Sequence, residues 1–399
     1  MSQINVDAIR SANGTGDAIS LAAASNTCTA NITNPPSDRR NLIINGDMNV
    51  AARCADGVYT STDSGYHTVD RWKLLHANTD EAPTQEQGHV LSGTTPYELG
   101  FRKTFKVTNG NQTNGLSAPD YILMRQVVEA QNLATSGWNY TSSSSYITLS
   151  FWCRSSVAQN FYGSIRSEDG TRQNYPFETG SLTANTWTKI TKKIPGNSNL
   201  QFDNNTGAGM EVEVNMAFGA DYTDSGVALN TWAAYASATI NPDNTTTWYT
   251  TNDATFELTG VQLEVGDYAT DYAHEPFSLN SLRCKRYYQT IGSYHWIVRQ
   301  GTGVDYGHAC LNSTFPLPVP MRTTPVGSNF DGTSTVTVKW WNAAYNSSTN
   351  LEAYVGEQFH NENIIWYLCH NEDDNSGTAL NTTKVMGELQ DTIAFDAEL

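Results

Sequence analysis

The sequence predicts an all-β protein: an extended N-terminal arm, a jelly-roll β-sandwich, a short helix and a second β-sandwich domain. Only 16% of the 399 residues are charged, whereas 11% are aromatic. Asn, Thr, Ser and Gly make up much of the remainder, which is typical of β-sheets with long loops. Apolar residues alternate with polar ones in several short segments, and the length suggests two or three domains.

Residues 1–40 are expected to form the arm. The turn signal NGTG at 13–16 separates two small apolar sets, and a low-complexity stretch containing Pro35 and Pro36 follows. Such a segment cannot bury enough apolar surface to fold alone. Two interpretations remain open, a disordered tail and a docking arm that partner chains order. The apolar residues of the arm are Ile4, Val6, Ile9, Ile19 and Leu21.

The first sandwich is expected over residues 41–275. In its clearest strand, MEVEVNMAF at 210–218, every second residue is apolar, so Glu211 and Glu213 are expected to point outward. The alternation recurs in ELGFRKTFKV at 98–107. Because Gly, Asn and Ser clusters separate many such segments and no long amphipathic helix interrupts them, a jelly roll is favoured.

The segment 256–291 is expected to end the first sandwich and to begin the second domain. It reads FELTGVQLEVGDYATDYAHEPFSLNSLRCKRYYQTI. Its first part alternates as a strand does, but the parity of the apolar residues changes at Gly260, which predicts a β-bulge.

A helical linker is expected at 276–292. Ser278 can cap a short helix over 279–289, and basic residues gather towards the end of that helix, where they interact favourably with its dipole. The apolar residues of one helix face are Leu279 and Leu282.

Residues 293–399 are expected to form the second β domain. TVTVKWW at 335–341 alternates, whereas NIIWYLCH at 363–370 is apolar on both faces, as a central strand would be. Four prolines within 315–325 indicate an edge strand or a loop, because proline cannot donate a hydrogen bond to a neighbouring strand.

Three parts of the chain resemble bacteriophage tail-fibre and related virion-attachment proteins, in which a jelly-roll domain like a carbohydrate-binding module is followed by a C-terminal β domain. The matching segments occur in the expected order. They are NLIINGDMNVAAR at 41–53 with VDRW at 69–72, GVQLEVG at 260–266 with LRCKRYY at 282–288, and FPLPVPMRTTP at 315–325.

This resemblance implies a structural virion protein of the tail, a homotrimer assembled in the host cytoplasm. Residues 1–40 would attach it to other tail or virion proteins, and residues 293–399 would contact a host-surface polysaccharide. Two alternatives remain open: a head or tail decoration protein with a purely structural role, and a polysaccharide-cleaving tail fibre or spike. The N-terminal residues show no signal-peptide pattern, which agrees with cytoplasmic synthesis.

Several functions are not expected. The net charge of −17 and the lack of a basic stripe disfavour nucleic-acid binding, and no apolar run approaches a membrane span. GxSxG, HExxH, GxxxxGK[ST] and GxGxxG after a strand are missing, so no enzyme is predicted. The six cysteines form no CxxC pair.

No cofactor is expected. Jelly-roll carbohydrate-binding modules, which the segment around Asp47 also resembles, often carry Phe-Glu at the next two positions, and that carboxylate helps to hold a structural calcium ion. Here Met48 and Asn49 stand in those places. Calcium therefore stays an open but disfavoured alternative.

Aromatic side chains are the predicted glycan-binding groups, because their flat faces stack on sugar rings. The alternation in 335–341 predicts that Trp340 faces the core and Trp341 faces outward. In the second domain the candidates are Trp341, Tyr345, Tyr294 and Trp296. In loops of the first sandwich, the exposed candidates are Trp232, Tyr235 and Trp248.

Overall fold

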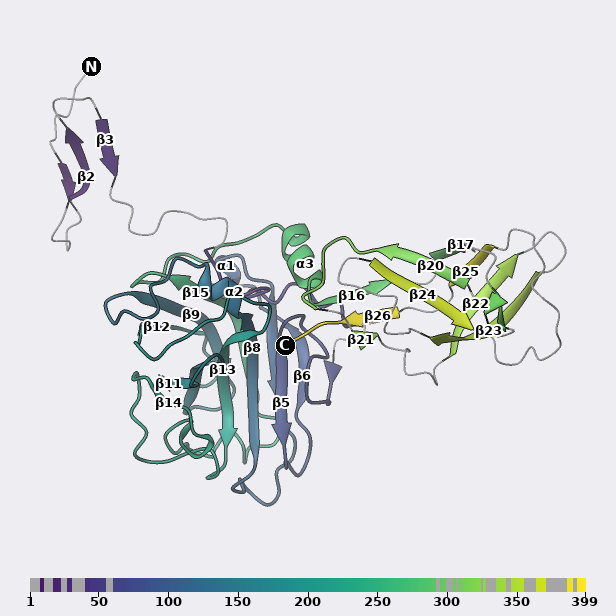
Figure 1. The fold of residues 1–399 in the computed structure, drawn as a ribbon. Coiled ribbons are helices and arrows are strands. Elements are labelled where there is room, and N and C mark those ends of the chain that lie inside the picture. Colours follow the sequence, from purple (N-terminus) through teal and green to yellow (C-terminus); the bar gives the residue numbers. More distant parts are fainter. Residues whose placement is uncertain are drawn as a thin grey trace.

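The computed structural model describes residues 40–54, 60–290, 317–323 and 394–399 with their side chains, and short strands elsewhere by their backbone. The all-β prediction is confirmed. Figure 1 shows the sandwich in the centre, the N-terminal strands to one side of it and the strands of the second domain to the other.

One sheet of the sandwich has six antiparallel strands in the order β14-β11-β10-β13-β8-β5. It faces the second sheet with alternate residues of each strand, among them Val212 and Val214. The strands are β5 (Lys73–Ala77), β8 (Tyr121–Glu129), β10 (Asn160–Ser167), β11 (Gln173–Ser181), β13 (Ala208–Phe218) and β14 (Ala233–Ala234).

The second sheet has the order β12-β9-β15-β7-β6-β4, so the chain crosses between the sheets repeatedly. The core between them is rich in aromatic rings, such as Phe161 and Phe256 with centroids 4.9 Å apart. The strands are β4 (Thr60–Ser61), β6 (Thr84–His89), β7 (Lys103–Thr108), β9 (Tyr146–Ser155), β12 (Thr188–Pro195) and β15 (Thr255–Val265).

The predicted bulge at Gly260 is confirmed. The register of β15 against β9 shifts between Thr259 and Gln262. Gly260 has a φ of 62°, and a Cβ added there would lie 2.7 Å from the ring of Phe101. Glycine is therefore required by both the backbone conformation and the close approach of the ring.

Within the described residues, three short helices accompany the strands: α1 (Thr95–Glu98), α2 (Ala130–Ala134) and α3 (Phe277–Lys285). The predicted Ser278 cap is wrong, because Pro276 is the N-cap residue and no side chain caps the helix. Proline at this position fixes an extended φ directly before the helix. A 3₁₀ turn, η2, covers Ser237–Thr239.

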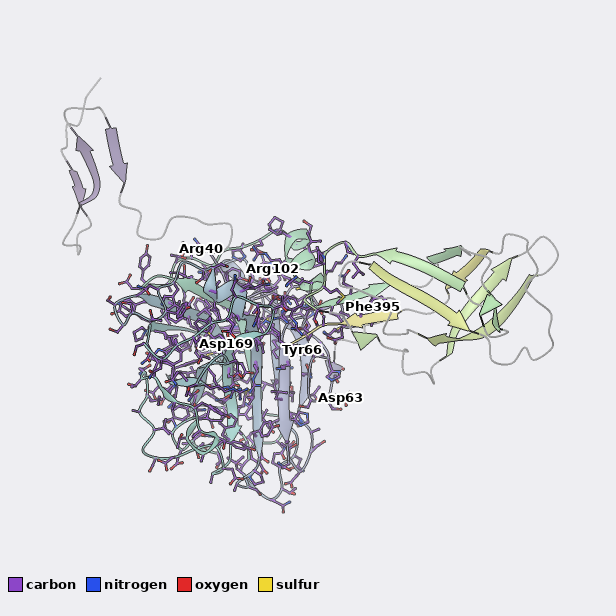
Figure 2. The ribbon with its side chains drawn as sticks, in the orientation of Figure 1. Arg40, Asp63, Tyr66, Arg102, Asp169 and Phe395 are labelled. Carbon is purple, nitrogen blue, oxygen red and sulfur yellow. The ribbon has the colours of Figure 1, made fainter. Side chains whose placement is uncertain are left out.

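Two connections join the sandwich to the second domain. After α3, β16 (Tyr288–Ile291) pairs with β26 (Ile393–Asp396), which also pairs with β21 (Val326–Gly327). The chain then returns, and residues 394–399 lie against the sandwich near Tyr66 (Figures 1 and 2).

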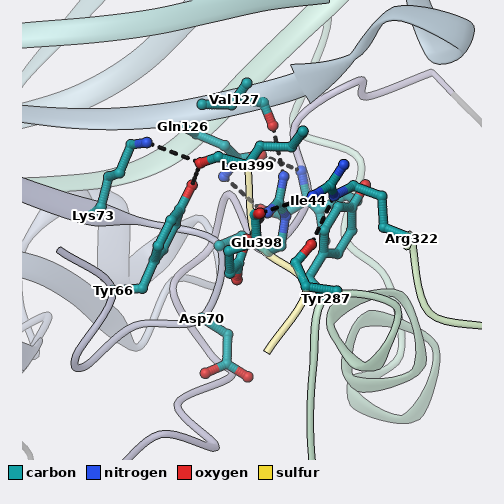
Figure 3. Close-up of polar contacts among 12 residues, drawn as sticks. Ile44, Tyr66, Asp70, Lys73, Gln126, Val127, Tyr287, Arg322, Glu398 and Leu399 are labelled. Atoms are coloured by element: carbon teal, nitrogen blue, oxygen red, sulfur yellow. Dashed lines mark hydrogen bonds and ion pairs between the residues drawn. The ribbon is translucent and has the colours of Figure 1, made fainter. Parts of the chain in front are cut away.

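This returning tail, residues 394–399, is held by polar contacts (Figure 3). Arg53 contacts Asp396 at 2.7 Å and Glu398 at 3.2 Å. Tyr66 Oη and Lys73 Nζ both donate hydrogen bonds to the Leu399 carbonyl oxygen, at 3.0 and 2.9 Å.

The remaining strands form small sheets. The arm contains β1 (Ala8–Arg10), β2 (Asp17–Ala22) and β3 (Thr27–Ala30) in that order. The second domain has the sheet β17-β25-β22-β23-β24-β20, in which the predicted interior position of β24 is confirmed, and residues 317–323, within the predicted edge strand or loop at 315–325, form a loop after the edge strand β20. Its strands are β17 (His295–Val298), β20 (Leu311–Pro316), β22 (Thr335–Trp341), β23 (Asn346–Tyr354), β24 (Ile364–His370) and β25 (Met386–Leu389), with a separate pair β18 (Val304–Asp305) and β19 (His308–Ala309).

Candidate functional site

The outer face of the sheet containing β13 carries rows of polar side chains, because every residue between the core-facing ones points away from the core. Strand pairing fixes which residues stand side by side. One row contains Lys73, Arg125, Glu213, Ser164 and Pro176, and the next contains Val127, Glu211, Arg166 and Asn174.

Glu211 and Glu213 do point outward as predicted, but they are buried, with only 7% and 1% of each residue exposed. Arg125 pairs with both carboxylates, at 3.0 Å for Glu211. Arg166 also pairs with Glu211, and it contacts Glu168 at 2.7 Å. The charges therefore form a compensated network, as burial requires.

The two carboxyl groups differ in their pKa. Burial raises the pKa of Glu211 above its ordinary value despite the nearby arginines. Burial also opposes ionisation of Glu213, but the charges of Arg125 and Arg166 outweigh it and lower its pKa. Glu211 is therefore the member of the pair that takes up a proton first.

The loop at 219–247 covers this face. Its Ile240 packs on Leu123 of β8, and the ring of Tyr235 lies 4.6 Å from the Arg166 guanidinium carbon. Asn174 Nδ2 donates a hydrogen bond of 2.8 Å to the Ile240 carbonyl. The loop is thus tied to the strands beneath it.

A pocket of about 310 Å³ lies between this loop and β11. We call it the loop pocket. Small apolar side chains and a few polar groups line it, among them Asn174, Pro176, Asp224, Val227, Thr231 and Ala233.

Asn174 is the most informative residue of the loop pocket. It is only 3% exposed, and its Oδ1 has no hydrogen-bond partner among the described residues. A buried acceptor without a donor costs about 1–3 kcal/mol. Asn174 Oδ1 therefore calls for a donor from a water molecule or a ligand.

Two of the predicted aromatic candidates are core residues, so the expectation of exposure is wrong for them. Trp248 is fully buried and Trp232 is 9% exposed. Their indole N–H groups donate to Thr255 and Pro195 carbonyls, which lets loop tryptophans pack inward. Tyr235 is partly buried beside Arg166.

The other predicted residues lie outside the described side chains. Trp341 and Trp296 belong to β22 and β17, and Trp341 pairs with Asn346. Tyr294 and Tyr345, together with Ile4 and Val6, lie outside the described residues altogether. For the remaining arm residues only the strands are described: Ile9 pairs with Ile19, and Leu21 pairs with Cys28.

The burial and hydrogen bonds of Asp47 are relevant to the alternative of a structural calcium ion. Asp47 is 3% exposed, and burial raises its pKa. Asn49 and Asn280 each donate an amide hydrogen bond to this carboxylate, at 2.5 and 2.9 Å. Within the described residues, no group of three or more His, Cys, Asp or Glu residues could hold a metal ion.

Sequence reasoning missed the loop pocket. Alternation around Tyr175 and Phe177 places Asn174 on the outer face, but nothing in the sequence indicates that residues 219–247 fold back over it. Across the part of the chain described with side chains, no helix is long and apolar enough to cross a membrane.

No protein-family model and no curated protein matches the chain. Several solved structures are similar at a low level. The enzymatically active domain of bacteriophage CBA120 tailspike protein 4 is 12% identical over 57% of this chain and 21% of that one, with a TM-score of 0.30. The chain thus spans about a fifth of that domain.

Two carbohydrate-binding modules from Clostridium thermocellum are also similar. The C-terminal family 22 module of Xyn10B is 11% identical over 52% of this chain and 94% of that one, with a TM-score of 0.28. The family 11 module in complex with a mixed-linked tetrasaccharide is 11% identical over 52% and 95%, with a TM-score of 0.23. Scores of this size carry no argument about function, which has to come from the chain's own residues.

Proposed function

We propose that this chain is a non-enzymatic virion protein of the tail-fibre type that binds a host-surface glycan. The virion role is supported by the three sequence segments that resemble tail-fibre proteins. Glycan binding is supported by one observation above all: the lining of the loop pocket includes Asn174, whose Oδ1 has no hydrogen-bond partner among the described residues.

The lining of the loop pocket suits a neutral sugar. Hydroxyl groups of a sugar ring are donors for Asn174 Oδ1, and Thr231 adds a hydroxyl of its own. Pro176 and Val227 offer apolar surface to the C–H face of the ring. The Asp224 carboxylate repels uronic and sialic acids, and the net charge of −17 acts in the same direction.

An N-acetylated sugar fits best. Its acetamido N–H donates to Asn174 Oδ1, while its methyl group packs on small side chains such as Ala233. This pairing explains why an amide acceptor stands among alanine, valine and proline.

Glycan cleavage is not proposed. Glycosidases hold two carboxyl groups about 5–9.5 Å apart around the scissile bond. On the outer face, the neighbouring carboxylates Glu211 and Glu213 are buried, and arginines pair with both. Incubation with N-acetylated glycan should therefore release no new reducing ends.

A second glycan contact is proposed in the C-terminal domain, at Trp341, Tyr345, Tyr294 and Trp296. The N-terminal strands and the second domain leave the sandwich on different sides (Figure 1), which supports attachment through residues 1–40 and host contact at the other end. The same proposal includes homotrimer formation, docking on other tail proteins and location in the virion tail.

The test is calorimetric titration of the purified protein with N-acetylated oligosaccharides. Asn174→Leu removes the acceptor and should abolish the binding assigned to the loop pocket, whereas Asn204→Leu, in an exposed loop, should not. If Asn174→Leu, with its fold verified, binds as well as the parent, the loop pocket is not the site.

A further inference from the structure

Helix α3 presents its apolar side chains to solvent. Six large hydrophobic side chains are exposed in the described part of the chain, and three of them belong to this nine-residue helix. Phe277 is 63% exposed, Leu279 42% and Leu282 40%. The other three are Leu91, Leu99 and Tyr268.

The inward face of α3 is fixed by polar contacts. Asn280 is 5% exposed, and its Nδ2 donates to Asp47 Oδ1 at 2.9 Å. Cys284, one turn later, is 1% exposed. Turning the helix to bury Leu279 and Leu282 would leave the Asn280 amide and the Asp47 carboxylate without their hydrogen bond. The leucines therefore stay outside in the single chain.

A hollow lies beside the same helix. It has a volume of about 250 Å³ and is lined in part by Leu42 and Ile44, by Arg283 of α3, and by Arg286 and Tyr287 directly after this helix. A protruding apolar pair and an apolar hollow thus occur next to each other on one surface.

Local charge also favours contact between copies at this surface. Chains with a net charge of −17 repel one another over most of their surface. Around α3 the charges are paired: Arg283 contacts Glu275 at 2.9 Å, and Arg286 contacts Glu129 at 2.7 Å. Copies can approach here with less repulsion.

The arm ends at the same place. Arg40 donates a hydrogen bond of 2.6 Å to the Asp271 carbonyl, and Asn41 lines the hollow. Contact through α3 would therefore bring the last residues of several arms together. The three-stranded sheet of each arm, β1-β2-β3, has two open edges that neighbouring arms can pair with.

We propose that α3 is an interface with a second copy of this chain. Leu279 and Leu282 of one copy enter the hollow at Leu42 and Ile44 of the next. The leucines of one copy meet the hollow of the next, so the proposed contact is heterologous, and it generates a ring when the rotation between copies closes. The inference rests on the proposed assembly of copies and does not depend on glycan binding.

The experiment measures the mass of the full chain at micromolar concentration by light scattering. The parent should give a multiple of 43.8 kDa. Leu279→Asp with Leu282→Asp should give a monomer with an unchanged melting temperature, because both side chains are exposed. The matched control is Leu91→Asp with Leu99→Asp, which changes side chains of similar or greater exposure and should stay assembled.

A mixing experiment tests the pairing of the two surfaces. Ile44→Glu places a charge in the hollow and should also give a monomer. Mixed with the Leu279→Asp, Leu282→Asp protein, it retains one intact contact, so heterodimers and no larger species should form. An assembled leucine variant, or a mixture that stays monomeric, would overturn the interface. A monomeric parent would overturn the interface and the assembly of copies, and titration with glycan would still test the loop pocket separately.

Discussion

Arg71 and Glu398 stand 327 residues apart in the sequence and form a buried ion pair. The side chains are 1% and 5% exposed. The Arg71 guanidinium also lies over the ring of Tyr287, 3.4 Å from its centroid, at the end of the segment that leaves α3. One side chain therefore joins the sandwich, the outgoing connection and the returning tail.

Arg71→Met should destabilise the protein by about 3–5 kcal/mol, because the buried Glu398 carboxylate loses one of its two arginine partners and the Val127 carbonyl loses its donor. Adding Glu398→Leu should restore part of the lost stability. Denaturant unfolding of both single variants and the double variant gives the coupling energy.

The control for this pair is Lys193 and Asp267, an exposed pair at 3.3 Å with 45% and 53% of the side chains accessible. Lys193→Met should change the free energy of unfolding by less than about 1 kcal/mol. Equal effects at the two pairs would contradict the structural role given to Arg71.

Asp70 predicts a pH dependence of stability. Burial raises the pKa of its carboxyl group to about 7, although Arg53 opposes the shift, and Oδ2 has no partner among the described residues. The folded state therefore holds a proton that the unfolded state releases near pH 4. The contribution of the protonated Asp70 side chain to the free energy of unfolding is fully present below about pH 4 and is lost as the pH rises through about 7.

Asp70→Asn keeps the shape of the side chain and removes the titration. The difference between its free energy of unfolding and that of the parent should grow in favour of the variant between pH 4 and pH 8. Unfolding curves at several pH values measure this difference. A difference that does not change with pH would show that Asp70 keeps an ordinary pKa.

Gly260→Ala should destabilise the protein by roughly 2–5 kcal/mol. The new Cβ would lie 2.7 Å from the Phe101 ring, and overpacking of a core typically costs about 1–3 kcal/mol. The left-handed backbone adds about 1–2 kcal/mol. Gly93→Ala is the matched control, because its φ is 82° and nothing lies within 4 Å, so only the backbone cost applies. Comparing the thermal unfolding of the Gly260→Ala and Gly93→Ala variants separates the packing cost from the backbone cost.

Periodicity predicted the strands well because one face of each strand meets the core. The alternation in 210–218 predicted the inward residues of β13 as far as Met216, and the parity change at Gly260 predicted the bulge. Phe218, expected inward as well, lies beyond a register shift at 215–217 and packs with Leu123 and Ile240 instead. The alternation and the parity change are local consequences of a side-chain period of two. They need no knowledge of what lies across the sheet.

Contacts between distant segments were not predictable in this way. The alternation in the sequence predicts that Glu211 and Glu213 face solvent. In the structure they are buried beneath the loop at 219–247 and pair with two arginines from other strands. Leu279 and Leu282 share one helix face as expected, but this apolar face points to solvent, because Asn280 takes the inward place with Asp47 as its partner. In each case a polar partner far along the chain decides the outcome.

The adjacent residues Trp340 and Trp341 of β22 test the glycan contact proposed for the C-terminal domain. Alternation predicts Trp340 in the core and Trp341 outside, so Trp340→Ala should cost about 3–5 kcal/mol of stability. Trp341→Ala should leave folding intact and weaken adsorption to host cells.

The size of the Trp341 effect follows from multivalency. A single shallow sugar site with a Kd of about 1 mM contributes only about −4 kcal/mol. Several sites on one assembly can raise avidity by about 10²–10⁴, so a modest loss at each site removes most of the adsorption. Adsorption should therefore fall more steeply in Trp341→Ala assemblies than in isolated chains titrated with glycan. Normal adsorption by folded Trp341→Ala assemblies would remove Trp341 from the contact.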